Sequence, residues 1–102
     1  MVCLPAKTSV PVMVGRLRMS CLVECFWSGV REEDLQDVDR RITDSVAALP
    51  DGDELQYLGS ILVLDDEVML CLFDGPLGTV RRVVEHARVP YERILRTTRT
   101  VG

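Results

Sequence analysis

The chain has 102 residues, the size of a single domain. Its composition, 47% hydrophobic and 27% charged, is typical of a folded globular protein. Twelve Lys and Arg against sixteen Asp and Glu give a net charge of −4, which argues against binding to nucleic acid, since that requires a basic face. No apolar run approaches the ~20 residues of a membrane span, and the N-terminus lacks the pattern of a secretory signal. We therefore expect a cytoplasmic protein with no nucleic-acid or membrane partner.

The cysteine spacing argues against a disulfide framework. The four cysteines are Cys3, Cys21, Cys25 and Cys71, and no two of them form a CxxC pair. In an extended strand, Cys21 and Cys25 share a face but lie about 13 Å apart, too far to bond to each other. Reduced, packed thiols are expected, as in a reducing compartment.

The first part of the chain divides into a leader and a strand–helix unit. Residues 1–16, with Pro5 and Pro11, are expected to form a tail or a short edge strand, and residues 17–102 to form the domain. Val, Phe, Trp and Cys predict a strand over about 18–27. The acidic "REED" then opens a helix, whose apolar residues recur at three- and four-residue steps until Pro50.

The second part repeats this arrangement after a hairpin. Two β-rich runs, 54–64 and 67–73, flank the acidic pair Asp65-Asp66 and predict a hairpin. A second helix is expected to start near Gly75-Pro76, because proline suits the first helical position. A last strand follows over about 91–101.

The predicted order, strand-helix-strand-strand-helix-strand, is that of the α+β ferredoxin-like fold, βαββαβ with an antiparallel sheet. In this fold the strands are ordered 4-1-3-2, and two helices cover one face only. The strands are nevertheless apolar on both faces, as Leu62 and Leu64 against Ile61 and Val63 illustrate. We therefore predict a homodimer in which two sheets pack face to face, as in a dimeric α+β barrel. The alternative is that the N-terminal tail folds across this face.

Glu24 is the most unusual residue of the first strand, because it lies between residues that normally pack inside. It shares a face with Leu22 and Phe26, in a strand expected to be central. A buried carboxylate without a partner is costly. Three interpretations are open: an ion pair with an arginine of the last strand (Arg93 or Arg96), an acid/base catalyst, or a metal ligand.

Other polar residues are candidates for a site. His86 is the only histidine, the residue type most often used to transfer protons near neutral pH, although a half-exposed histidine without a special role explains it as well. Tyr57 and Ser60 interrupt the apolar hairpin, and the Tyr57 hydroxyl either orients a ligand or lies at the rim of the core. Cys71 is expected to be a core thiol, because nothing in the sequence indicates a basic partner.

A metal site has few soft ligands to draw on. Nickel and zinc favour imidazole and thiolate, and one histidine with scattered cysteines does not supply them within one chain. Asp65, Asp66 and Glu67 offer oxygens to a hard cation, though a solvated turn explains them equally. A site shared across a dimer axis would double the ligands.

Three segments carry a resemblance to a known family: "LVE" (22–24), "YLGSILVLDDEVMLCLF" (57–73) and "HARVPYERI" (86–94). From Arg18 to Val101 the chain resembles the small bacterial ferredoxin-like family catalogued as domain of unknown function 4242, one branch of which is described as nickel-binding. The resemblance implies a ferredoxin-like fold. Arg88 stands where the family usually has glycine at the end of the second helix.

These observations together predict a small-molecule enzyme or binder of the dimeric α+β barrel type, with a cavity between sheet and helices. It would need no cofactor and would perform acid/base chemistry like a cyclase or isomerase, in a biosynthetic pathway for example. Glu24 is expected to move the proton and Tyr57 or His86 to polarise the substrate. The residues expected to contact the substrate are Phe26, Ser60, Cys71 and Arg93. The alternatives are a protein that binds nickel or another divalent metal, and an interaction module without chemistry.

Overall fold

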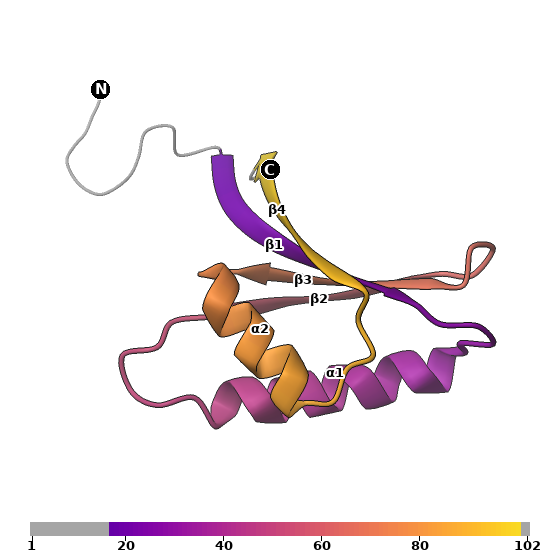
Figure 1. Ribbon diagram of the computed structural model, residues 1–102, viewed down its shortest axis with the longest axis horizontal. Coiled ribbons are helices and arrows are strands. Elements are labelled where there is room, and N and C mark those ends of the chain that lie inside the picture. Colours follow the sequence, from indigo (N-terminus) through magenta and orange to yellow (C-terminus); the bar gives the residue numbers. More distant parts are fainter. Residues whose placement is uncertain (1–16, 101–102) are drawn as a thin grey trace.

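The computed structural model describes residues 17–100, and the expected leader, residues 1–16, lies outside them. The described chain forms six elements in the predicted order (Figure 1). They are β1 (Leu17–Phe26), α1 (Glu32–Ala47), β2 (Gln56–Val63), β3 (Val68–Asp74), α2 (Leu77–His86) and β4 (Arg93–Thr100). Neither helix of this part of the chain is long and apolar enough to cross a membrane.

The four strands form one antiparallel sheet in the order β2-β3-β1-β4, which confirms the predicted α+β, ferredoxin-like arrangement. Both helices lie on the same side of the sheet (Figure 1). We call the side that they cover the helix face and the other side the open face.

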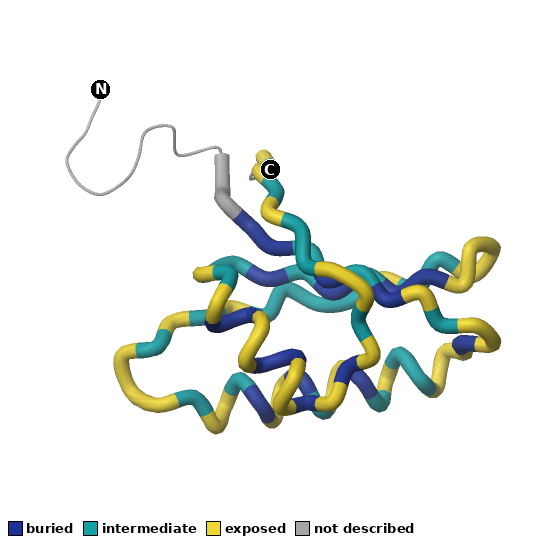
Figure 2. Tube along the Cα trace, in the orientation of Figure 1, coloured by how far each residue is buried: buried dark blue, intermediate teal, exposed yellow. Residues whose placement is uncertain are grey.

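The core lies between the helices and the sheet. Cys21, Val23 and Cys25 of β1 are buried on the helix face, and they alternate with Leu22 and Glu24, which point the other way. The helices contribute the buried residues Val38, Ile42, Val80, Val83 and Val84. Figure 2 shows buried residues in both the helices and the sheet, where they alternate with more exposed ones.

Helix α1 begins where the acidic segment predicts. The backbone N–H of Arg31 donates to the Asp34 carboxylate at 2.9 Å, and Glu32, Glu33 and Asp34 occupy the first turn, where carboxylates favour the positive end of the helix dipole. The helix turns its apolar stripe, with Val38 and Ile42, toward the sheet.

Strand β2 contains a β-bulge that the sequence analysis did not predict. Tyr57 lies opposite Phe73 and Gly59 opposite Leu72, so Leu58 is the additional residue. Gly59 has a φ of +115°, a conformation that favours glycine. Without the bulge, Tyr57 and Ser60 would point to opposite faces, because side chains alternate along a strand. With it, both point to the helix face.

Helix α2 differs in detail from its prediction at both ends. Pro76 is the residue before the first helical position, not the first helical residue itself. At the other end, Arg88 adopts a φ of +58°, and the Val89 N–H donates to the Val84 carbonyl at 2.9 Å. Arg88 therefore occupies the left-handed position where the resembling family usually has glycine.

Candidate functional site

The open face carries an ion pair between the central strand β1 and the edge strand β4. Glu24 of β1 and Arg93 of β4 are directly opposite in the antiparallel register. The Arg93 Nε donates to Glu24 Oε1 at 2.6 Å, so the structure contains the ion pair that was one of the three interpretations of Glu24. The Glu24 side chain is 15% exposed, whereas that of Arg93 is 61% exposed. The Arg93 side chain makes no other hydrogen bond within residues 17–100, so the outer edge of its guanidinium group is accessible.

Apolar side chains surround this pair. Phe26 and Ile61 are 55% and 60% exposed, which is unusual for residues in the strands of a sheet. They belong to an open-face patch, defined by the register of the strands, that consists of Leu22, Phe26, Ile61, Val63, Leu70, Leu72 and Leu95. This patch confirms that both faces of the sheet are apolar.

Glu24 does not lie in a cavity between the sheet and the helices, where the sequence analysis placed the site. Its side chain points away from the helices, while its neighbours Val23 and Cys25 are fully buried beneath them. The reason is the alternation of side chains along β1, which puts even-numbered residues on the open face. Any chemistry of Glu24 therefore takes place on the open face.

Tyr57 and Ser60 form a separate polar cluster on the helix face. The Tyr57 hydroxyl donates to Asp39 Oδ1 of α1 at 2.8 Å, and it lies 2.6 Å from the Ser60 hydroxyl. Because the one phenolic proton goes to Asp39, Ser60 is the donor in the second bond. Burial raises the pKa of Tyr57 above its ordinary value, so the phenol is neutral near pH 7.

Cys71 lies opposite Ser60 in the register and is fully buried, as is Cys25 on the neighbouring strand. The hydrogen bond between these two thiols, followed by burial, raises the pKa of Cys25, while the same bond lowers the pKa of Cys71. Both are free thiols, in agreement with the expectation of core cysteines. Neither reaches the surface of the domain.

His86 is the last residue of α2 and is exposed. Its Nδ1 lies 3.1 Å from the hydroxyl of buried Ser45, which itself donates to the Val83 carbonyl at 3.0 Å. Because the Ser45 proton is used in that bond, Nδ1 of His86 is the donor and Nε2 faces away from Ser45. His86 thus joins the two helices.

A polar cluster at one end of the open face had no counterpart in the sequence analysis. Buried Ser20 donates to Asp74 Oδ1 at 2.6 Å, and Arg99 donates from Nη2 to Asp74 Oδ2 at 2.9 Å and from Nε to the Ser20 hydroxyl at 3.2 Å. The cluster connects β1, β3 and β4. Only the register of three strands, which a single sequence does not reveal, brings these residues together.

The metal interpretation finds no support in the described part of the chain. Residues 17–100 contain no group of three or more His, Cys, Asp or Glu residues placed to hold a metal ion. In the acidic turn, the Glu67 carboxylate accepts the Gly29 N–H at 3.0 Å and so connects the hairpin to the loop before α1.

The predicted site residues therefore fall into separate places. Glu24, Arg93 and Phe26 share the open face. Tyr57, Ser60 and Cys71 share the helix face, and His86 lies at the end of α2. Comparison of the chain with protein-family models, with curated proteins and with solved structures finds no match.

Proposed function

We propose that the protein is a homodimeric enzyme that moves a proton within a small carbonyl compound, as an isomerase or cyclase does. The observation that carries this proposal is the Glu24–Arg93 pair. It is a mostly buried carboxylate, 2.6 Å from an accessible guanidinium group, on a sheet face that is otherwise apolar at its centre. Membership of the family that the sequence resembles is part of the same proposal.

Each member of the pair has one task. The Glu24 carboxylate removes a proton from the carbon next to a carbonyl group, and the electron pair of the C–H bond moves to the carbonyl oxygen to form an enolate. The free edge of the Arg93 guanidinium stabilises the negative charge of that oxygen. The protonated Glu24 then returns the proton to another atom of the same molecule, so no cofactor is needed. Arg93 takes the polarising role expected of Tyr57 or His86, because neither of these lies on the open face.

A second copy of the chain encloses the site. The open-face patch leaves large apolar side chains in water, and a second sheet packed about 10 Å away would cover them. Removal of water strengthens the attraction between a charged group and the enolate, because the local dielectric constant falls. The Glu24–Arg93 pairs of the two protomers then line one enclosed space.

Proton exchange at carbon tests the proposal without knowledge of the natural substrate. Acetoacetate is incubated with the protein in D₂O, and NMR follows the loss of its C2 proton signal. We expect the protein to exchange this proton faster than buffer alone. Glu24→Gln is expected to reduce the part of the rate that is due to the protein about 100-fold, the usual contribution of a general base.

Glu32→Gln is the matched control, because Glu32 is an exposed carboxylate in the first turn of α1. It should exchange protons at the wild-type rate. If the C2 protons of acetoacetate and of a panel of aromatic β-keto acids exchange no faster with the wild-type protein than in buffer, the proposed enzymatic function is wrong. A dimer without exchange would support the interaction module instead.

A further inference from the structure

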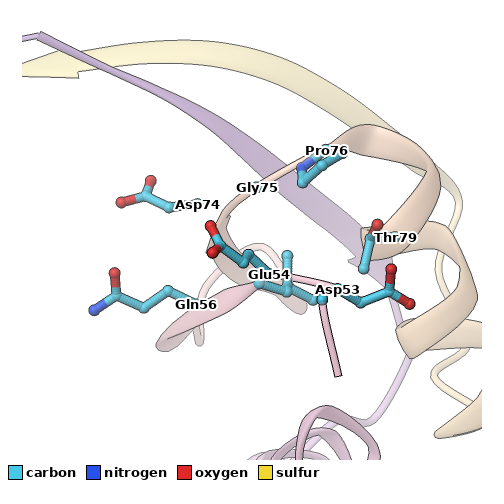
Figure 3. A pocket seen from close by; sticks show the side chains of 9 residues that line it. Asp53, Glu54, Gln56, Asp74, Gly75, Pro76 and Thr79 are labelled. Atoms are coloured by element: carbon cyan, nitrogen blue, oxygen red, sulfur yellow. The ribbon is translucent and has the colours of Figure 1, made fainter. Parts of the chain in front are cut away.

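A pocket of about 730 Å³ lies where β2 begins, β3 ends and α2 begins (Figure 3). Its lining includes Asp53, Glu54, Gln56, Asp74, Gly75 and Thr79. Neither Glu24 nor Arg93 lines it, so its use is independent of the proposed proton transfer.

Thr79 is the first indication that this pocket receives a ligand. It lines the pocket and is 8% exposed, yet its hydroxyl has no hydrogen-bond partner within residues 17–100. The hydroxyl oxygen itself is not fully enclosed, since Arg41 Nε is the only fully buried polar side-chain atom without a hydrogen-bond partner within residues 17–100. The Thr79 hydroxyl is therefore available to a partner from outside.

The start of α2 is the second indication. Pro76 precedes the helix and no side chain of residues 17–100 caps it, so the N–H groups of Leu77, Gly78 and Thr79 have no side-chain acceptor in this part of the chain. The same end of the 10-residue helix carries the positive end of its dipole. A negatively charged group is favoured here, and the Thr79 hydroxyl lies beside it.

The carboxylates of the pocket differ in whether they are neutralised. Asp53 is paired with Arg82 at 2.9 Å, and Asp74 is paired with Arg99 at the same distance. Glu54 is exposed and forms no ion pair within the described residues. Figure 3 shows Glu54, Asp74 and Gln56 toward one side of the pocket, and Thr79 beside Asp53 on the other. Glu54 leaves a negative charge without a partner among residues 17–100 on the first side, whereas Arg82 neutralises the Asp53 carboxylate near Thr79.

We infer that this pocket binds a small zwitterion of the amino-acid class. Its carboxylate accepts hydrogen bonds from the Thr79 hydroxyl and from the first turn of α2, and its ammonium group pairs with Glu54. The Arg82–Asp53 and Arg99–Asp74 pairs remove the repulsion that two of the three carboxylates would otherwise exert on the ligand.

The test is an NMR titration of the ¹⁵N-labelled full-length protein with glycine, β-alanine and γ-aminobutyrate, which differ in the distance between their charges. We expect saturable shifts of the Gly75 and Thr79 amide signals with at least one of them. Acetate carries only the carboxylate and methylammonium only the ammonium group. Each should bind at least about tenfold more weakly than the amino acid, because each makes only part of the contacts. The signals of residues around Glu24 should not move.

Two variants test the contacts. Thr79→Val removes the hydroxyl and keeps the shape, and Glu54→Gln removes the charge. Each should weaken binding about fivefold or more, the value of one hydrogen bond. Thr43→Val, at an exposed threonine of α1, is the control and should bind normally.

The inference is wrong if none of the three amino acids gives a saturable shift at 50 mM, or if both variants bind like the wild-type protein. Should Thr79→Val give the spectrum of an unfolded chain, Glu54→Gln alone decides. Because this readout does not involve Glu24, it fails or succeeds independently of proton exchange with acetoacetate.

Discussion

Arg41 of α1 donates from Nη1 to the carbonyl oxygens of Ala87 and Arg88, both at 3.1 Å, at the C-terminal end of α2. The last carbonyl groups of a helix have no partner within the helix, and a guanidinium group here also opposes the negative end of the dipole. One side chain of α1 therefore satisfies two carbonyl groups at the end of α2 and connects the two helices.

Arg41→Met is expected to lower the free energy of unfolding by about 1–2 kcal/mol, because it removes two hydrogen bonds from a charged donor and the ion pair with Asp37 at 3.1 Å, while it keeps the aliphatic part. Urea unfolding followed by circular dichroism measures the change. Arg40→Met is the control, since Arg40 is exposed and, among residues 17–100, forms an ion pair with Asp37 alone, the same carboxylate that pairs with Arg41. An equal effect of both variants would contradict this role of Arg41.

Arg88→Gly is expected to stabilise the protein by about 1 kcal/mol. Arg88 has a φ of +58°, and only glycine adopts this region without steric cost. Its carbonyl still accepts the bond from Arg41 after the change. Arg88→Ala, which removes the same side chain but keeps the strain, should show no such gain in the same thermal-unfolding experiment.

Gly59→Ala is expected to destabilise the protein by about 1–2 kcal/mol, because a Cβ is strained at a φ of +115°. No neighbouring atom lies within 4 Å of the added Cβ, so strain of the backbone is the cause and not a collision. Gly78→Ala in α2 also meets no atom within 4 Å and has no positive φ; it should stabilise by up to about 0.5–1 kcal/mol. Effects of the same sign in both variants would refute this account of the bulge.

Stability is expected to fall above about pH 10 because of Tyr57. Burial raises the pKa of this phenol above its ordinary value of 10.0, so in alkaline solution the unfolded chain loses the proton first. The contribution of neutral, buried Tyr57 to the free energy of unfolding is constant below pH 10 and is lost as the pH rises further. Tyr57→Phe should therefore flatten the decline of unfolding free energy between pH 10 and about 11.5. Tyr91→Phe, at a phenol close to the surface, should flatten it less.

Ile61→Lys is expected to convert the proposed dimer into a monomer, because it places a charge in the open-face patch. Multi-angle light scattering at micromolar concentration measures the mass. Leu64→Lys is a close control: Leu64 is 62% exposed, against 60% for Ile61, but it lies in the hairpin turn. A monomeric wild-type protein, or loss of the dimer in both variants, would refute face-to-face packing.

The sequence was sufficient to predict the fold, because each element has a clear period or boundary. The stripe of α1 and the apolar runs on each side of Asp65-Asp66 define the helix and the hairpin. The observed ends of some elements differ from the predicted ones by a few residues. The hairpin turn covers 64–67, and β4 begins at Arg93 because Tyr91 and Glu92 lie in the loop before it.

The site was predictable only in part. The alternation along β1 put Glu24 with Leu22 and Phe26, and pairing of β1 with β4 made Arg93 a plausible partner. Which face the helices cover cannot be read from β1 itself, since both of its faces are apolar. Tyr57 and Ser60 lie on the same face only because of one additional residue, Leu58. Local composition does not distinguish such a bulge from a regular strand.

The pocket beside α2 was missed for a different reason. Its residues come from the loop before β2, the end of β3 and the start of α2, which are far apart in the sequence. Gly75-Pro76 indicated only the start of a helix. A signal for the pocket appears once burial is known, because Thr79 is then a polar residue without a partner among the described residues.

The bulge in β2 has a further consequence, because β2 is an edge strand of the sheet. A regular edge strand presents an unbroken row of free N–H and C=O groups to which another chain can add, and such additions lead to aggregates. The additional residue at Leu58 interrupts this row near one end of the strand. At the opposite edge, β4 carries Arg96, which is exposed and forms no ion pair within residues 17–100, and its charge discourages the approach of a like strand. The sheet is thus protected along both margins, whereas its open face exposes the large apolar side chains of Phe26 and Ile61.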